Sequence, residues 1–403
     1  MIGPFEQHSD RVDGFLDALR EAEYVSEHFA MFEAFFSRKK FVGERLDMKV
    51  LLVTFSDNAD HQDITFGMFE SLYKAHRFDC ETWVIGINTP KVPVMDTPQT
   101  YLVDCPKRPG IEKKTFDLKE LHSIISWINK QHFDVIFFET LHVWNLAIML
   151  RCHKKVKMYQ MIHDLIPHEG DKQAKSVDFM NKAVCKIADY IVLANQKYVP
   201  KVTEIYGVDP KRVFYIDMWR RFPDYTEPKY TKHALFFGRM NPYKGVDNLL
   251  EIVKLCPNIQ FDIVGRVDPL VQNQVNKLKT LPNVTMNNGY VSDDEMAEAF
   301  INADWVILPY NSATQSGVVI DGYRYGRPCI AFNVGAITEQ VNEGISGYLI
   351  RPGNNEAFAK KLREAVEMDP DSYEKLSRSA YDFGSRKYAA NGAVDRFINL
   401  ING

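Results

Sequence analysis

The sequence has few cysteines and no excess of basic residues, and both absences exclude classes of protein. Its 403 residues include six cysteines, none in a Cys-x-x-Cys pair, so a disulfide framework or a zinc site is not expected. Lysines and arginines number 49 against 53 aspartates and glutamates, giving a net charge of -4. That balance argues against a bulk attraction to nucleic acid. We expect free thiols in a reducing compartment.

Long apolar runs and a signal-like start are also missing. No run is long enough to cross a bilayer, and Glu6, Asp10 and Asp13 stand where a signal peptide would have basic and then apolar residues. The sequence therefore predicts a cytoplasmic protein. Two basic clusters leave open a peripheral contact with the inner face of a membrane, although a solvated surface is the alternative. They are Lys107, Arg108, Lys113 and Lys114, and Arg151, Lys154, Lys155 and Lys157.

What the sequence does contain is an alternation of short apolar runs with amphipathic stretches. This alternation is typical of α/β folds with parallel sheets. A polar, proline-bearing stretch at 220–228 interrupts the series, so we predict two doubly wound domains. The predicted strands are 49–55, 82–85, 135–138, 156–162, 191–194 and 213–216, and then 234–237, 260–264, 284–286, 305–308, 328–332 and 347–350.

Four segments follow from this division of the chain. Residues 1–47 form a helical N-terminal extension, 48–218 a first Rossmann-like domain and 219–383 a second one. Residues 384–403 form a C-terminal helix that returns to the first domain. The apolar spacing in the extension fits packing on a domain surface, and a membrane or partner contact is the alternative.

The first chemical motif opens the second domain. Gly238 lets the chain turn sharply as it leaves a strand, so Arg239 projects at the carboxyl edge of the sheet. Lys244 lies just before a helix that we expect to begin near Val246. Two cations beside a helix N-terminus suit a diphosphate, and a solvated turn is the alternative.

The second motif precedes a helix expected from Val318 to Gly326. Small residues in Tyr310–Gly317 expose backbone N–H groups, and Ser316 is a suitable N-cap residue. Asp321 lies about one turn inside the helix, where a carboxylate could accept hydrogen bonds from a ribose. Alternatively, it only stabilises the start of the helix.

The first domain offers candidates at the ends of three strands. His163 and Asp164 follow one strand and Glu139 follows another, so all three are expected to face the same cleft. A capping aspartate and a histidine at the core edge are the alternative. The loop Ser56–Ile64 contains three acids and a histidine, but their spacing matches no standard metal-ligand set. We interpret it as a polar acceptor loop.

Segments of the second half resemble a known family. GRMNPYKGVDNLLEIV resembles the arginine–lysine diphosphate motif of glycosyltransferase family 4, the retaining GT-B enzymes also called glycosyl transferases group 1. ATQSGVVIDGYRYGRPCIAFNVGAITEQV resembles its donor-sugar and ribose motif. GYVSDDEMAEAFINADWVILPY is similar to the stretch around the donor base, and GYLIRPGNNEAFAKKL to the segment that follows. The resemblance extends over residues 235–362 and is weaker over 49–216.

The resemblance implies a GT-B fold, in which an acceptor domain (48–218) and a nucleotide-sugar donor domain (219–383) face each other across a cleft. It implies that Arg239 and Lys244 neutralise the donor diphosphate without a metal and that His163 lies near the donor sugar. These three residues are the implied catalytic set. The other implied donor contacts are Asp164, Gly238, Tyr290, Val291, Thr314, Gln315, Ser316, Gly317, Val318 and Asp321.

One position departs from the family pattern. The family often has two glutamates eight positions apart, and Asp321 stands at the second. The first falls within 313–315, where the sequence has no acid. We expect the backbone and side chains of 314–317 to hold the sugar and phosphate instead.

The resemblance predicts a retaining glycosyltransferase. It would move a hexose-type sugar from a UDP- or GDP-linked donor to a glycan or lipid-linked acceptor, in cell-surface polysaccharide or glycoconjugate synthesis. No metal and no other cofactor are expected. A GT-B sugar-nucleotide epimerase is one alternative. A non-catalytic nucleotide-sugar-binding protein is another, which the missing glutamate leaves open.

Overall fold

The structure is a computed structural model of the chain, and it describes residues 48–75, 80–107, 112–152, 155–166, 174–289 and 291–402. The predicted extension 1–47 lies outside these residues, as do Tyr290, Arg108 and Lys154. All six cysteines are described and free, as expected. Within the described part of the chain, no helix is both long enough and apolar enough to span a membrane.

The first domain contains a sheet of seven parallel strands in the order β3-β2-β1-β4-β5-β6-β7. Strand β1 lies in the interior of this sheet. The chain adds β2 and β3 on one side of β1 and then crosses to add β4 to β7 on the other side. Ligands of open parallel sheets bind at the carboxyl ends of the strands beside such a switch point. The strands are β1 (Met48–Thr54), β2 (Cys80–Ile87), β3 (Thr100–Val103), β4 (Val135–Phe138), β5 (Lys157–Ile162), β6 (Tyr190–Leu193) and β7 (Val213–Tyr215).

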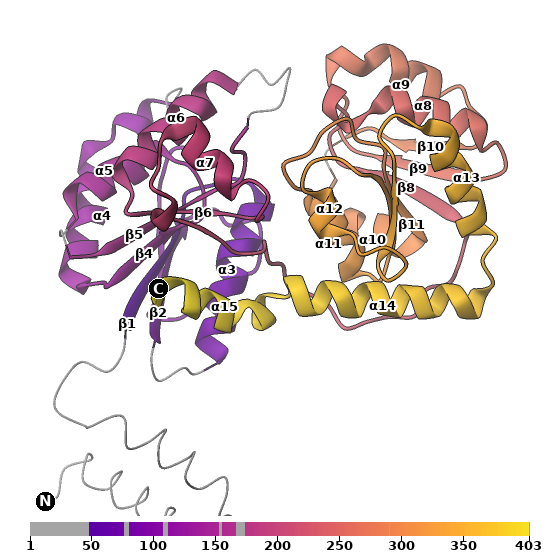
Figure 1. Cartoon of the computed structure of the whole chain (residues 1–403). Helices are drawn as coiled ribbons and strands as arrows, with labels where there is room; N and C mark the ends of the chain where they lie inside the picture. The colour runs from indigo at the N-terminus through magenta and orange to yellow at the C-terminus, as the bar shows by residue number, and fades with distance from the viewer. Residues whose placement is uncertain are drawn as a thin grey trace, which may run out of the picture. The chain divides into compact units, whose positions relative to one another are not determined.

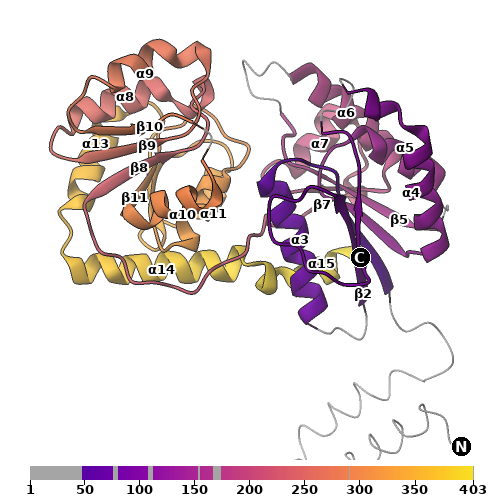
Figure 2. The ribbon, with the colours of Figure 1, turned by 180° about the vertical axis from the view of Figure 1, so that it is seen from behind.

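Helices cover both faces of this sheet (Figures 1 and 2). Every β1 residue after Met48 is buried, which is typical of a parallel strand covered on both sides. In α4 the buried residues Leu121, Ile124 and Ile128 recur at helical spacing and form one apolar face. The helices are α3 (Ala59–Lys74), η1 (Lys113–Phe116), α4 (Leu118–Gln131), α5 (Val143–Arg151), α6 (Ala174–Ile187), α7 (Val199–Tyr206) and η2 (Pro210–Arg212).

The second domain contains a sheet of six parallel strands in the order β10-β9-β8-β11-β12-β13. Its switch point lies between β8 and β11. The strands are β8 (His233–Phe237), β9 (Gln260–Val264), β10 (Val284–Asn287), β11 (Trp305–Leu308), β12 (Cys329–Phe332) and β13 (Gly347–Ile350).

The helices of the second domain begin close to the predicted positions. The predicted helix near Val246 is α8, and α10 begins at a complete capping box in which Ser292 and Glu295 bond each other's backbone N–H groups. The helices are η3 (Pro242–Lys244), α8 (Val246–Leu255), η4 (Pro269–Val271), α9 (Gln272–Leu278), α10 (Asp293–Asn302), α11 (Gly317–Arg324), α12 (Ile337–Gln340) and α13 (Asn355–Val366).

The chain passes between the domains twice. After β7 it enters the second domain, and it returns through α14 (Pro370–Tyr388) and α15 (Ala390–Asn402). The two crossings are joined where Arg220 N donates to Tyr388 O at 2.8 Å and Ala390 N donates to Arg220 O at 2.9 Å. Helix α15 then packs against α3 of the first domain.

Every predicted strand is present, so the expected α/β architecture is confirmed. The prediction missed β3, an edge strand in which only Val103 is buried. Such a strand lacks the continuous apolar run by which the others are recognised. The segment boundaries at 48, 219 and 384 stay predictions.

Candidate functional site

A cavity of about 670 Å³ lies where loops from the carboxyl ends of strands in both sheets meet. Its walls come from the loops after β1, β8, β9 and β11 and from the first turn of α11. This is the position at which α/β proteins bind ligands. The lining includes Ser56–Asp60, Lys91 and Lys107 from the first domain, and Gly238, Arg239, Lys244, Val291, Gln315, Ser316, Gly317, Val318 and Asp321 from the second.

Lys244 is a buried cation at the base of the loop after β8. Its Nζ donates to the carbonyl of Phe237 at 3.3 Å and lies 5.3 Å from the centre of the Tyr310 ring. A Cβ on Gly238 would stand 2.5 Å from this Nζ, and Gly238 has φ +98, so glycine is required there. Burial lowers the pKa of Lys244 to about 8. An anionic ligand would give this cation a stronger acceptor than a carbonyl oxygen.

Arg239 lies nearer the rim of the cavity. Its side chain is 54% exposed and donates from Nη2 to the Asp268 carboxylate at 2.6 Å. An anion that binds to Arg239 must therefore share or displace Asp268.

The loop before α11 is fixed by its backbone. Ser316 N donates to Gln340 Oε1 at 2.8 Å, and Gln340 Nε2 donates back to Ser316 O at 3.0 Å. Ser316 is the N-cap residue of α11, as predicted, although its side chain makes no capping hydrogen bond. Gly317 and Val318 line the cavity, so the first turn of α11 presents its partial positive charge there.

Thr314 connects the same loop to the first domain. Asn195 Nδ2 donates to Thr314 O at 3.0 Å, and Thr314 Oγ1 donates to Asp164 Oδ1 at 3.3 Å. Thr314 and Asp164 therefore contact each other behind the cavity, and neither side chain is part of its lining.

Asp321 lines the cavity with a carboxylate that is already partly satisfied. Arg324 Nη1 donates to Asp321 Oδ1 at 3.1 Å, and Arg220 Nε lies 3.8 Å from the same oxygen. Burial raises the pKa of Asp321, and the two guanidinium groups oppose that shift. Both of these contacts are made to Oδ1.

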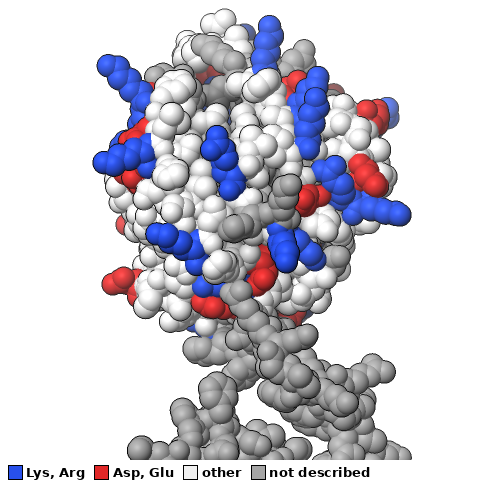
Figure 3. Space-filling model, turned by 90° about the vertical axis from the view of Figure 1, so that its left-hand side faces the viewer, with Lys and Arg blue, Asp and Glu red and all other residues white. Residues whose placement is uncertain are grey.

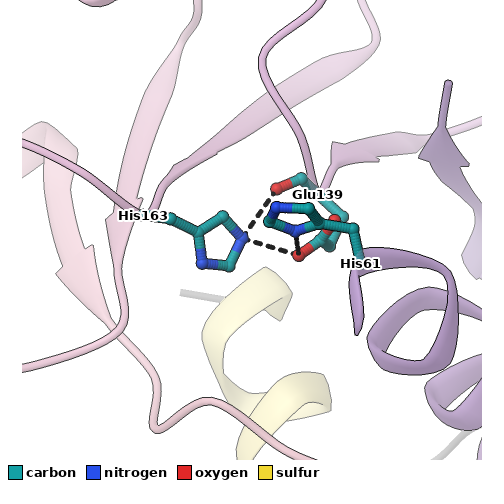
Figure 4. Close-up of side chains that lie close together, drawn as sticks. All are labelled: His61, Glu139 and His163. Atoms are coloured by element: carbon teal, nitrogen blue, oxygen red, sulfur yellow. Dashed lines mark hydrogen bonds and ion pairs between the residues drawn. The ribbon is translucent and has the colours of Figure 1, made fainter. Parts of the chain in front are cut away.

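Three side chains from separate elements meet beside the cavity: His61 of α3, Glu139 after β4 and His163 after β5 (Figure 4). Glu139 Oε1 lies 3.1 Å from His61 Nδ1 and 2.6 Å from His163 Nε2. A carboxylate only accepts hydrogen bonds, so both of these ring nitrogens carry a proton.

The tautomers follow from these contacts. His163 Nδ1 lies 3.2 Å from Gln315 Nε2, an amide donor, and accepts from it. Both ring nitrogens of His163 are therefore occupied, whereas His61 keeps its Nε2 free of this cluster. The predicted contact between His163 and a donor sugar requires that Gln315 move or act as the intermediary. Gln315 Oε1 is buried and has no hydrogen-bond partner among the described residues.

Glu139 holds the charge of the cluster. Burial would raise its pKa, but the two histidines lower the pKa of Glu139 to about 2. Burial lowers the pKa of His61, yet the charge and hydrogen bond of Glu139 outweigh it and the pKa is raised. The cluster therefore favours a proton on His61 next to the ionised carboxylate of Glu139.

The same three residues also offer a possible ligand set for a metal ion. One atom from each residue lies within 4.8 Å of the others, and two imidazoles with a carboxylate suit zinc or iron. The hydrogen bonds already satisfy these atoms without an ion. The absence of a metal stays a prediction that a chelation experiment can test.

The structure brings most of the predicted site residues together. Nine of them line the cavity: Gly238, Arg239, Lys244, Val291, Gln315, Ser316, Gly317, Val318 and Asp321. His163 contacts the lining residue Gln315, Asp164 and Thr314 contact each other next to it, and Tyr290 lies outside the described residues. Their roles stay predictions.

Sequence reasoning missed Arg220, Gln340 and the partnership of His61 with Glu139. His61 lies in the segment 56–64, which was predicted to be a loop facing the acceptor; the loop ends at Asn58, and from Ala59 on the segment forms the start of α3. Gln340 lies within the quoted donor-sugar segment but was not singled out there, and no motif marks Arg220.

Comparisons with known proteins agree with this picture. Residues 231–368 match the family model described as "Glycosyl transferases group 1". The chain is 24% identical over 301 residues to an uncharacterized 41.2 kDa protein in the cps region of Klebsiella pneumoniae, covering 69% of this chain and 81% of that protein. It is 22% identical over 301 residues to the O-antigen chain mannosyltransferase C of Escherichia coli, covering 72% and 77%. Three other relatives are matched over 64%, 32% and 34% of their length.

A solved structure confirms the expected GT-B fold. The crystal structure of Anabaena Alr3699/HepE in complex with UDP aligns with a TM-score of 0.63 at 16% identity, covering 88% of this chain and 100% of that one.

Proposed function

Through residues 231–368 this chain belongs to the glycosyl transferases group 1, and from this premise we propose that it is a retaining glycosyltransferase. It takes a hexose-type sugar from a UDP- or GDP-linked donor and transfers it to a glycan or lipid-linked acceptor in polysaccharide or glycoconjugate synthesis. The relatives named for O-antigen mannosyl transfer and for a complex with UDP support this choice.

One observation carries the proposal: a buried lysine and the first turn of a helix face the same cavity as a carboxylate. Lys244 and the N-terminal end of α11 can share a diphosphate, and Asp321 can accept from the ribose hydroxyls. Asp57 and Asp60 of the first domain also line the cavity, and we assign to them the hydroxyl groups of the acceptor.

Binding measurements test the donor assignment. Wild-type protein should bind UDP or GDP in a calorimetric titration. Asp321→Asn should weaken that binding about tenfold or more, because a charge-assisted hydrogen bond to the ribose becomes a neutral one. An unchanged dissociation constant in this variant would show that Asp321 only stabilises its helix. Incubation with a panel of nucleotide sugars then separates transfer from epimerisation and from binding without turnover.

In the proposed reaction, the acceptor attacks the face of the sugar from which the diphosphate leaves. The bond between the anomeric carbon and the phosphate oxygen breaks, and the bond to the acceptor oxygen forms on the same face. Lys244, Arg239 and the N–H groups of α11 stabilise the charge on the departing diphosphate. A phosphate oxygen takes the acceptor proton. Proton NMR of the product should show the anomeric configuration of the donor, and an inverted product would overturn this mechanism.

His163 orients the sugar in this scheme, directly or through Gln315, and does not attack it. His163→Ala should slow transfer without abolishing it. Mass spectrometry of the enzyme should find no glycosylated carboxylate; a sugar trapped on Asp164 or Glu139 would contradict the single-step route.

The reaction needs no metal in this proposal, because cations of the protein neutralise the diphosphate. Dialysis against EDTA should leave the rate unchanged. Loss of activity that manganese, magnesium or zinc restores would show that the reaction needs a metal, and His61, Glu139 and His163 would then be the candidate ligands.

We also propose a peripheral membrane contact through the first domain. Lysine and arginine side chains are spread over one face of this domain, with acidic side chains among them and uncharged surface between (Figure 3). Phe116, Leu118, Leu150 and Phe179 of this domain are exposed by 65% or more. Co-sedimentation with vesicles of anionic phospholipid should capture the protein at low salt, and neutral vesicles should capture less.

A further inference from the structure

The linker between the domains carries a buried arginine. Arg220 is only 4% exposed, and its backbone bonds to Tyr388 and Ala390 hold it where the chain crosses between the domains. An ion this deeply buried is unfavourable unless acids or acceptors compensate it. The groups around the Arg220 guanidinium therefore indicate the role of this residue.

The guanidinium group lies between one acid from each domain. Arg220 Nε is 3.8 Å from Asp321 Oδ1, and Arg220 Nη2 is 3.9 Å from Asp60 Oδ1. The same Nη2 is 3.2 Å from the position of a Cβ on Gly317, at the start of α11. Within the described residues, Arg220 Nε has no hydrogen-bond partner. The cation is shared between two carboxylates rather than bonded to either.

Both carboxylates, and Gly317, line the cavity proposed for the donor. A nucleoside diphosphate entering it brings negative charge toward two acids. Arg324 also donates to Asp321, whereas the ion pair of Asp60 is with Arg220. The Asp60 side chain is 60% exposed and also interacts with Lys244, so water and Lys244 already screen part of its charge; without Arg220, more of that charge would act on the diphosphate.

We propose that Arg220 is a positioning residue that compensates Asp60 and Asp321, so that the cavity accepts a diphosphate while keeping both carboxylates ionised. This inference rests on the proposed donor site. Because the arginine belongs to the linker and its two acids to different domains, it also connects donor binding with the first turn of α3, which contains Asp60.

Calorimetric titration with UDP and GDP tests the inference. Arg220→Gln should weaken binding by about tenfold or more, and Asp60→Asn in the same chain should restore most of the loss. Arg220→Lys keeps the charge and should stay within about threefold of wild type. Arg221→Gln is the matched control: this neighbouring linker arginine pairs with Asp63 and Glu70 of α3 and should leave binding unchanged.

The outcomes separate the possible explanations. If Arg220→Gln binds as tightly as wild type, or if Asp60→Asn restores nothing, Arg220 is a structural linker residue and the inference is wrong. If Arg220→Gln does not fold, a loss of about tenfold in Arg220→Lys contradicts the inference and near-normal binding supports it. If wild-type protein binds no nucleoside diphosphate, the proposed function itself fails.

Discussion

Glu139 is 1% exposed and keeps its charge between two imidazole rings. A buried carboxylate is costly unless its partners replace the water it has lost. Here two histidines from different elements do so at Oε1, whereas the buried Oε2 has no hydrogen-bond partner among the described residues. This arrangement also fixes which nitrogen of each ring carries a proton. The orientation of His163 toward Gln315 therefore depends on a residue that does not itself line the cavity.

The first prediction concerns Glu139→Gln, which keeps the shape and removes the charge. The pKa of Glu139 is lowered from 4.5 to about 2, so its stabilisation is present above pH 4.5 and is lost as the pH falls toward 2. The pKa of His61 is raised from 6.5, so its stabilisation is present below pH 6.5 and is lost as the pH rises through the raised value. Between pH 4.5 and pH 6.5, the stabilisation from Glu139 and the stabilisation from His61 are therefore both present.

Urea unfolding should therefore show a larger loss of stability in Glu139→Gln at pH 5.5 than at pH 8.5, with about 3 kcal/mol lost at the lower pH. Glu204→Gln is a suitable control, because Glu204 forms an exposed ion pair with Lys201 and should change stability by less than about 0.5 kcal/mol. Equal losses at both pH values would contradict the coupling of Glu139 with His61.

The second prediction concerns Lys244, whose pKa is lowered to about 8 by burial. A bound diphosphate raises this pKa, so binding at pH 8 should take up about half a proton and should weaken as the pH rises further. Calorimetry in buffers of different ionisation enthalpy measures this uptake. Lys244→Gln should abolish it, whereas Lys254→Gln, on the exposed side of α8, should retain it. Binding without proton uptake in wild-type protein would show that Lys244 does not meet the phosphates.

These residues differ in how far the sequence could predict them. Lys244 and Asp321 occur in motifs with fixed spacing from a strand or a helix start, so the local sequence pattern was enough to predict them as site residues. Glu139 follows β4 and His61 lies in the first turn of α3. These positions did not reveal their contact, because that contact depends on the order of β1, β4 and β5 in the sheet. Arg220 lies in an irregular linker with no periodicity, and its role depends on two acids far away in the sequence.

At the scale of elements, the donor loops are held in place by close backbone contact. Gly245 ends η3 and precedes α8 with φ +67, and a Cβ there would lie 1.9 Å from the carbonyl oxygen of Pro309. Pro309 follows β11 and begins the loop that leads to α11. The two loops that present Lys244 and Gly317 therefore rest directly on each other.

The third prediction is that Gly245→Ala separates these loops. Strain from the positive φ should cost about 1–2 kcal/mol, and the overlap with Pro309 should add roughly 1–3 kcal/mol. Gly353→Ala is the matched control, because Gly353 has φ +74 but open space around it, so only the strain applies. Thermal unfolding and UDP binding should both change more in Gly245→Ala. Similar effects in the two variants would show that the contact with Pro309 is unimportant.

At the scale of the whole molecule, the end of the chain completes the core of the first domain. Phe397 of α15 lies 5.2 Å from Phe137 of β4 and 6.0 Å from Trp219, measured between ring centres. Tyr159 of β5 also donates to the backbone of α15. The first domain therefore folds around a helix that is made only after the second domain.

The last prediction tests this dependence through Phe397→Ala. Removing a buried aromatic ring should lower the free energy of unfolding by about 3–5 kcal/mol. The first domain should be the one destabilised, although Phe397 follows the whole second domain in sequence. Hydrogen exchange monitored by mass spectrometry should become faster in β4 and β5 and stay unchanged in β8 and β9, because local opening reports the stability of each region separately. Ile205→Ala, at a side chain 45% exposed in the first domain, should leave both sheets unchanged. Faster exchange in both sheets after Phe397→Ala would show that the domains unfold as one unit, and unchanged exchange in β4 and β5 would show that α15 adds little to the first core.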